Sequence, residues 1–469
     1  MKMNIIDEFI TKLEKNNICM HSFLFMKDGK TVADGYCSPF RKGQLHRMYS
    51  VTKSFVSIAI GMLCDEGKLS LDDKVVDFFK AEFELTDVHP YLANTTIRDL
   101  LIMATPYSRS TYGPDTKAWL KSYFIGTEPD HPSGTAFSYD SCGSYVLGAL
   151  VKRVSGKTFV DYMRPLFDKI GISRDVYCLE GPDGELWSGS GLMASTEDLA
   201  KFTQFLLNRG LWNDEQLVSK DYIVQATSSQ IYNNTSTHDY SWYCGYGYQI
   251  WMLKDEAFCL NGMGGQFGIG FPGKDIVFAC NADIQGNVCG KDVIFNALWD
   301  IADQIADAPV IGTDTRNLAI NPPKGSMTCD LQQDISGVAF EMNQNSMGMK
   351  WLKITFDGTM GILQYENRTG EKTLSFGLGK YEACLFPELY SGDRLFDDTK
   401  KKMYTSINAA AWITSNTLLI RSYIIDDYIG NLTMTFCFKG DEVGVAMSKN
   451  AQFFLDDYQG FAGGRKTNP

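Results

Sequence analysis

Residues 54–63 place the strongest constraint on the fold of this chain, because a helix built from them is apolar on nearly every side. Their apolar members are Phe55, Val56, Ile58, Ala59, Ile60, Met62 and Leu63. They leave no polar stripe along the helix, and a helix without such a stripe is buried inside a protein. We therefore expect the rest of the fold to surround this helix.

A serine and a lysine stand at the head of this helix, in the tetrapeptide Ser50-Val51-Thr52-Lys53. Residues three apart share one face of a helix, so the Lys53 side chain reaches the Ser50 hydroxyl. Burial disfavours the ammonium ion and lowers the pKa of a lysine, which suits Lys53 to take a proton from Ser50 near neutral pH. The Ser50 N–H group, at the positive end of the helix dipole, is a candidate donor to an oxyanion. A Ser-x-x-Lys tetrapeptide is expected about twice by chance in a chain of this composition, but this one is the only match.

The helix runs into the acidic segment Asp65-Glu66-Gly67-Lys68-Leu69-Ser70-Leu71-Asp72-Asp73. Together with Ser50 and Lys53, this segment resembles the serine hydrolases of the β-lactamase and penicillin-binding-protein superfamily. The resemblance is strongest to the branch of class C β-lactamases, D-aminopeptidase-like enzymes and related esterases. In that family Ser-x-x-Lys opens the central helix and Gly-x-Leu-x-Leu-Asp-Asp follows it. The resemblance covers roughly residues 20–305.

A second element of the resemblance is Phe137-Ser138-Tyr139-Asp140-Ser141, which precedes a predicted helix. The family carries Tyr-x-Asn on a loop before such a helix. Tyr139 matches the tyrosine, whereas Ser141 replaces the asparagine. A phenol near a serine and a lysine can pass a proton to the leaving group and later activate water. The alternative is that one of the polar residues only caps the helix and that Tyr139 packs.

The third element, Asn261-Gly262-Met263-Gly264-Gly265-Gln266-Phe267, departs most from the family. Penicillin-recognising members carry Lys-Thr-Gly here, and aligning the glycines places Met263 where that cation would be. Gly264 and Gly265 would let substrate lie against the strand backbone, and the N–H group of Gln266 is the candidate second oxyanion donor. Without the lysine, recognition of a substrate carboxylate is in question. A turn rich in glycine, with no role in catalysis, is the alternative.

Several aromatic residues precede this element, namely Trp242, Tyr243, Tyr246, Tyr248 and Trp251. They either line an apolar pocket or pack within a core strand, and for any one of them packing is the more common arrangement.

Composition describes an ordinary globular protein with 44% hydrophobic residues and a net charge of −12. This charge argues against nucleic acid or an anionic membrane as a partner, because both attract basic patches. The cysteines form no Cys-x-x-Cys pair and the five histidines no metal-binding spacing, so we expect reduced thiols, no metal and no other cofactor. Residues 1–17 predict an amphipathic helix and no run is long enough to span a membrane, which indicates a cytoplasmic protein.

The order of the predicted elements indicates an α+β fold. Strands near residues 22–35 and 246–280 enclose a mostly helical region, so one sheet is completed by distant segments. In the family this is an α/β sandwich, an antiparallel sheet flanked by helices. We predict a hydrolase domain over residues 1–308, a linker over 309–326 and an all-β domain over 327–469, which generally resembles lipocalin-like barrels.

These observations predict a serine acyl hydrolase that acts through an acyl-enzyme on a small-molecule ester or amide. A β-lactamase, D-Ala carboxypeptidase or D-aminopeptidase remains an alternative, with the cation supplied from elsewhere in the fold. A binding or sensor protein on a catalytically silent fold is the alternative of another class. The sequence does not name the substrate, the oligomeric state or the task of the β domain.

Overall fold

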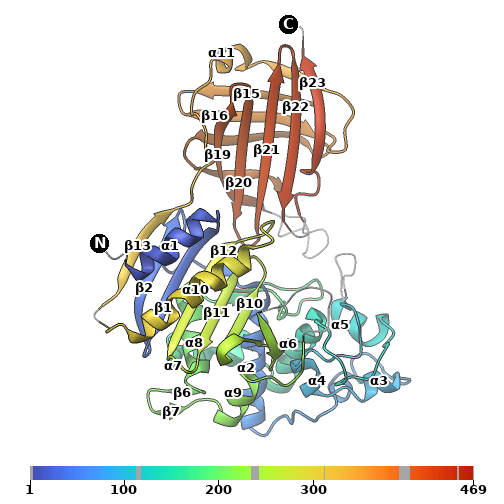
Figure 1. Cartoon of the computed structure of the whole chain (residues 1–469). Helices are drawn as coiled ribbons and strands as arrows, with labels where there is room; N and C mark the ends of the chain where they lie inside the picture. Colours follow the sequence, from blue (N-terminus) through green and yellow to red (C-terminus); the bar gives the residue numbers. More distant parts are fainter. Residues whose placement is uncertain are drawn as a thin grey trace. The chain divides into compact units, whose positions relative to one another are not determined.

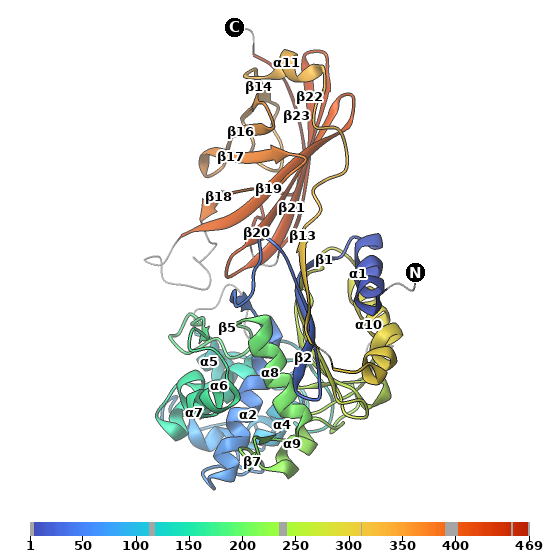
Figure 2. The ribbon, with the colours of Figure 1, turned by 90° about the vertical axis from the view of Figure 1, so that its left-hand side faces the viewer.

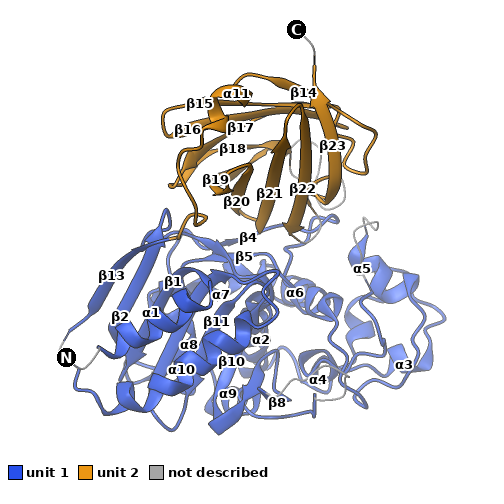
Figure 3. Ribbon diagram, turned by 45° about the horizontal axis from the view of Figure 1, so that its top comes forward, with its two compact units in different colours: residues 1–319 blue, residues 320–469 orange. Residues whose placement is uncertain are grey.

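The computed structural model describes residues 4–111, 118–233, 242–310, 312–389, 402–451 and 454–467. The chain divides into two compact units, Met1–Ala319 and Ile320–Pro469 (Figure 3).

An eight-stranded sheet forms the framework of the first unit, with the strand order β13-β2-β1-β12-β11-β10-β9-β8. The strands are β1 (Cys19–Lys27), β2 (Lys30–Ser38), β8 (Tyr243–Tyr246), β9 (Trp251–Leu253), β10 (Phe258–Gly262), β11 (Gln266–Phe271), β12 (Ile276–Asp283) and β13 (Asp314–Ala319). The hairpin β1–β2 pairs with β12, so the two ends of the unit share one sheet (Figure 1). The predicted sheet of distant segments is confirmed.

Helices cover both faces of this sheet (Figure 2). Helices α1 (Ile5–Lys15) and α10 (Gly290–Asp307) pack together on one face, and α8 (Thr196–Leu207) packs against β1, β11 and β12 on the other. On the first face Phe9 of α1 lies 5.3 Å from Phe25 and 5.4 Å from Phe23, measured between ring centroids. On the second face a Cβ atom at Gly268 would lie 2.4 Å from Thr203 Oγ1, so the close approach of α8 requires glycine there. The α+β sandwich is therefore as predicted.

A helical region lies between the two sets of strands. Helix α2 (Thr52–Asp65) is its centre and contacts α6, α7 and α9. Eleven of its 14 residues are buried, as the apolar pattern predicts. Around it lie α3 (Pro90–Ala93), α4 (Ile97–Leu101), α5 (Trp119–Lys121), α6 (Ser141–Ser155), α7 (Phe159–Ile170) and α9 (Lys220–Ala226), with the short strands β3 (His46–Arg47), β4 (Tyr177–Cys178), β5 (Leu192–Ala194), β6 (Leu211–Trp212) and β7 (Glu215–Gln216).

The linker predicted over residues 309–326 contains an edge strand. Residues Asp314–Ala319 form β13, which pairs in parallel with β2. Arg316 holds this strand through ion pairs with Asp7 of α1 at 2.6 Å and with Asp314 at 2.7 Å. The sequence of β13 lacks an apolar alternation because the strand is half exposed, and its backbone hydrogen bonds define it instead. The boundary between the units follows this strand.

The second unit is a ten-stranded sheet with the order β17-β16-β15-β14-β23-β22-β21-β20-β19-β18. Its strands are β14 (Ala339–Met342), β15 (Trp351–Asp357), β16 (Met360–Asn367), β17 (Gly370–Leu378), β18 (Glu382–Leu389), β19 (Met403–Thr414), β20 (Thr417–Ile425), β21 (Ile429–Lys439), β22 (Glu442–Asn450) and β23 (Gly460–Lys466), with one short helix, α11 (Leu331–Ile335). A short parallel pairing joins the end strand β17 to β19, the neighbour of the other end strand β18, so the sheet closes on itself (Figure 3). The predicted all-β tail is confirmed.

Candidate active site

Ser50 lies in a tight turn that leads directly into α2. The turn is a 3-10 helix, Tyr49–Val51, and the α-helix itself begins at Thr52. The Met48 N–H group donates to the Leu192 carbonyl of β5 at 2.7 Å. The Thr52 hydroxyl donates to the Tyr49 carbonyl at 2.6 Å and accepts from the Leu192 N–H group at 3.0 Å. Tyr49 has a φ of 46°, a strained conformation for a residue with a side chain. The neighbouring strand thus holds the serine in a defined place.

The Lys53 side chain points at the Ser50 hydroxyl. Lys53 Nζ lies 2.9 Å from Ser50 Oγ and 2.5 Å from the Gly189 carbonyl oxygen, and the residue is 1% exposed. Burial lowers the pKa of Lys53 to about 7, against the opposing effect of the negative charge on Asp140. A large share of Lys53 is therefore neutral near pH 7. A neutral Lys53 amine that donates an N–H hydrogen bond to the Gly189 carbonyl can direct its lone pair toward the Ser50 hydroxyl.

A buried arginine, Arg47, holds the loop that carries Gly189 by bonding its neighbour Ser190. Arg47 Nε donates to the Ser190 carbonyl at 3.0 Å. Its guanidinium carbon lies 4.5 Å from the ring centre of Tyr49 and 4.4 Å from that of Trp187. Arg47 therefore joins the turn that carries Ser50 to the loop that carries Gly189.

Tyr139, the candidate acid–base residue from the resemblance, lies beside Ser50 and Lys53. Its side chain forms a hydrogen bond with Ser50, and Lys53 Nζ lies 5.1 Å from the centre of its ring. Burial raises the pKa of Tyr139 to about 12, although the hydrogen bond to Ser50 opposes this shift. The phenol is therefore protonated near neutral pH and is a proton donor. The residue is still 36% exposed, so part of its ring faces solvent.

Asp140 is the residue that caps α6. Its side chain accepts a hydrogen bond from the Cys142 N–H group at 2.9 Å, and the residue is fully buried. Burial raises the pKa of Asp140 to about 6, partly offset by backbone hydrogen bonds and by Lys53. Its charge also acts on Lys53. Ser141, which replaces the family's asparagine and is a candidate substrate-binding residue, is the half-buried first residue of α6.

The third sequence element lies beside the serine turn. Strands β10 and β11 both contact the turn over Tyr49–Val51. A Cβ atom at Gly262 would lie only 2.3 Å from the Met48 carbonyl oxygen, so the close approach of β10 requires glycine. Gly264 and Gly265, with φ values of 81° and 95°, form the tight turn to β11. The half-buried Met263 stands in this turn.

Gln266 uses its side chain for structure. Its Nε2 atom donates to the Ala282 carbonyl at 2.8 Å and to the Met263 carbonyl at 3.1 Å, and the residue is fully buried. The amide thus ties the turn to β12. The side chain is thus engaged, and the candidate oxyanion donor of Gln266 is its backbone N–H group, as the sequence analysis names it.

Two features of the site were not predicted. The Gly189 carbonyl is a backbone group on a distant loop, and nothing in the sequence marks it. For Asp140 the sequence predicts at most a role as a helix cap. Its position next to Tyr139 was the available signal that its charge lies near the lysine.

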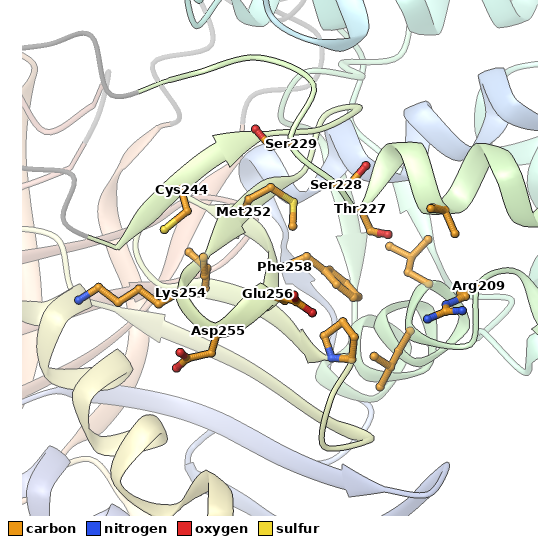
Figure 4. A pocket seen from close by; sticks show the side chains of 15 residues that line it. Arg209, Thr227, Ser228, Ser229, Cys244, Met252, Lys254, Asp255, Glu256 and Phe258 are labelled. Atoms are coloured by element: carbon orange, nitrogen blue, oxygen red, sulfur yellow. The ribbon is translucent and has the colours of Figure 1, made fainter.

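A separate pocket of about 640 Å³ lies elsewhere in the first unit (Figure 4). It is lined by the C-terminal ends of α8 and α9 and by β9 and β10, and Ser50, Lys53 and Tyr139 are not among its lining residues. Its apolar lining is Leu206, Leu207, Val224, Met252, Leu253, Phe258 and Pro272. Arg209 and Glu256, of opposite charge, line it as well.

No group of three or more His, Cys, Asp or Glu side chains among the described residues could hold a metal ion. Of the helices that the structure describes, none is long and apolar enough to span a bilayer.

Comparison with known proteins places the chain in a family. The sequence model of the beta-lactamase family matches residues 9–288, more than half of the chain. The chain belongs to the beta-lactamase family. The predicted superfamily is thereby confirmed, and the matched range of this beta-lactamase family member includes all three sequence elements.

Its relatives are distant. The 6-aminohexanoate-dimer hydrolase of Paenarthrobacter ureafaciens is 24% identical over 224 residues, 44% of this chain and 56% of the relative. Protein flp of Staphylococcus aureus (strain COL) is 27% identical over 241 residues, 42% of this chain and 47% of the relative. The chain thus spans about half the length of these curated relatives. Among solved structures, a penicillin-binding protein homologue from Pyrococcus abyssi matches 98% of this chain and 99% of its own, with a TM-score of 0.51 and 17% identity.

Proposed function

We propose that the protein is a serine acyl hydrolase with Ser50 as its nucleophile. The observation that carries this proposal is the 2.9 Å contact between Ser50 Oγ and the amine of Lys53, whose burial brings its pKa to about 7. A general base works best when its pKa lies near the working pH. A lysine of ordinary pKa, fully charged at neutral pH, would have no lone pair to accept the serine proton.

The residues divide the proton transfers between them. Neutral Lys53 takes the Ser50 proton while Oγ forms a bond to the acyl carbon, and the N–H groups of Ser50 and Gln266 bind the resulting oxyanion. Tyr139, whose pKa of about 12 keeps the phenol protonated near neutral pH, gives a proton to the leaving group as the bond to the acyl carbon breaks. The Lys53 ammonium then passes the proton from Ser50 to the Tyr139 phenolate. Water attacks the acyl-enzyme and releases the acid and free Ser50.

The substrate we propose is a small ester or amide that lacks an essential carboxylate. Met263 stands where penicillin-recognising members carry a cation, and an unpaired carboxylate in a partly dry site loses hydration without gaining charge-assisted hydrogen bonds. The name of the Paenarthrobacter relative, a 6-aminohexanoate-dimer hydrolase, is consistent with an amide as substrate. For an enzyme of this kind we expect no cofactor, a small-molecule substrate, no nucleic-acid or membrane partner, and a cytoplasmic location.

Exchanging Met263 for lysine tests this substrate class. We expect Met263→Lys to raise kcat/KM for a cephalosporin, relative to a neutral aryl ester, by about tenfold or more, the worth of one charge-assisted hydrogen bond. Met327→Lys adds the same charge at an exposed methionine of the second unit and is the matched control. Efficient turnover of the cephalosporin by the unaltered protein would instead favour a β-lactamase with a cation from another part of the fold.

The dependence on pH tests the assignment of the base. Because neutral Lys53 is the active form, kcat/KM for an ester should rise with pH through an apparent pKa near 7. Asp140→Asn keeps a capping side chain but removes a negative charge that favours the ammonium form. The rising limb should therefore move to lower pH. The two groups titrate close together, so the measured value belongs to the pair. If the rise of kcat/KM with pH occurs at the same pH in the variant, Lys53 is not the titrating base.

A burst of product tests the proposal against a non-catalytic binding protein. Mixing the protein with excess 4-nitrophenyl acetate should release one equivalent of 4-nitrophenol rapidly, followed by slower turnover, when deacylation limits the rate. A protein that only binds ligands gives neither phase.

A further inference from the structure

Trp251 is the centre of an aromatic cluster next to the candidate active site. Its ring centre lies 4.3 Å from that of Tyr243, 5.0 Å from Tyr246, 5.6 Å from Tyr139 and 5.8 Å from Phe137. The interplanar angle between Trp251 and Tyr139 is 26°, so these two rings stack. The proposed proton donor of the site therefore stands against an indole of strand β9, which lies between β8 and β10 in the sheet.

Trp251 is more exposed than two of its four ring neighbours, Tyr243 and Tyr246. Tyr246 is 1% exposed and Tyr243 is 8% exposed, so both belong to the core. Trp251 is only partly buried, and Tyr139 is 36% exposed. The stacked pair thus offers exposed aromatic surface near Ser50, which bonds Tyr139, whereas Tyr243 and Tyr246 are buried contacts of Trp251.

The indole N–H group of Trp251 has no hydrogen-bond partner among the described residues, although tryptophan N–H groups usually find a partner when buried. By contrast, the indole of Trp299 donates to Asp255 at 2.8 Å. Trp251 is partly buried and stacks on Tyr139, which bonds Ser50, so its N–H group is a candidate donor to an acceptor atom on a bound molecule.

We propose that Trp251 is a substrate-binding residue that selects esters and amides whose leaving group carries an aromatic or other flat apolar group. This inference rests on the proposed function. The leaving group must approach the Tyr139 phenol to receive its proton, and Trp251 stacks on that ring. A flat leaving group next to Tyr139 gains contact with the Trp251 indole. An acceptor atom on that group can also accept a hydrogen bond from the indole N–H group.

Two substrates with a common acyl group separate binding from chemistry. We expect Trp251→Leu to lower kcat/KM for phenyl acetate by about three- to tenfold, mainly through a higher KM, because an aromatic contact contributes a binding free energy of this size. The value of kcat/KM for trifluoroethyl acetate, which lacks a ring, should change less than twofold. Trp251→Phe keeps a ring without the N–H donor and should fall between the unaltered protein and Trp251→Leu. Trp299→Leu, at a partly buried tryptophan of α10, is the control for loss of an indole.

The possible results separate a failure of this inference from a failure of the proposed serine hydrolase function. An equal loss of kcat/KM for both esters would mean that Trp251 only positions Tyr139, and no loss for either would mean that it does not contact substrate. Either result overturns the inference while leaving a serine hydrolase in place. Failure of the unaltered protein to hydrolyse both esters would overturn the proposed function and this inference with it.

Discussion

Ser50→Ala is expected to lower kcat for activated esters by at least about 10⁴-fold, because removal of a serine nucleophile has effects of this size or larger. The variant should remain folded, since the change deletes one hydroxyl that bonds only side chains of the site, Lys53 and Tyr139. Steady-state hydrolysis of 4-nitrophenyl acetate and the melting temperature measure the two effects separately. Undiminished turnover would remove Ser50 from the mechanism.

Lys53 belongs to the same prediction, since the serine and its base act as a unit. Lys53→Met keeps the length of the buried side chain and deletes the amine, so we expect a loss of activity of similar size. Lys152→Met, at a surface lysine of α6 that pairs with Glu185, is the matched control and should retain full activity. A Lys53→Met protein with normal turnover would show that another group takes the serine proton.

Tyr139→Phe is expected to lower kcat by about a hundredfold or more, the usual cost of losing a general acid–base group. The substitution keeps the ring that stacks on Trp251 and deletes the oxygen that bonds Ser50. Substrates with poor leaving groups should suffer more than those with good ones, because they depend more on the proton that Tyr139 gives.

Tyr91→Phe is the control for this substitution, since Tyr91 is 37% exposed, close to the 36% of Tyr139, and lies on α3. Equal rates for Tyr139→Phe and the unaltered protein on both esters and amides would reduce Tyr139 to a packing residue.

Local spacing predicted the most important contact of the site. Two residues three apart at a helix start must face the same way, and an apolar helix must be buried, so the Ser50–Lys53 pair and the lowered lysine pKa followed from short-range physics. The position of Tyr139 came from the resemblance, because no local rule brings residue 139 to residue 50. The fold class followed from the order of strands and helices.

Long-range contacts account for what the sequence did not predict. The Gly189 carbonyl reaches Lys53 through a loop held by Arg47, and neither partner carries a recognisable motif. Strand β13 lacks apolar alternation because it lies at an exposed sheet edge, so the segment resembled a linker. The Gln266 side chain is committed to β12 by a contact with Ala282, 16 residues away. Such contacts depend on the tertiary fold and leave little trace in local patterns.

Covalent labelling tests the central claim most directly. A fluorophosphonate forms a stable bond with an activated serine, and digestion followed by mass spectrometry locates the bond. We predict one equivalent of label on Ser50, with loss of ester hydrolysis in proportion to labelling and no label on Ser50→Ala or Lys53→Met. Full inactivation with the label on another serine, or hydrolysis that persists after Ser50 is completely labelled, would contradict the account.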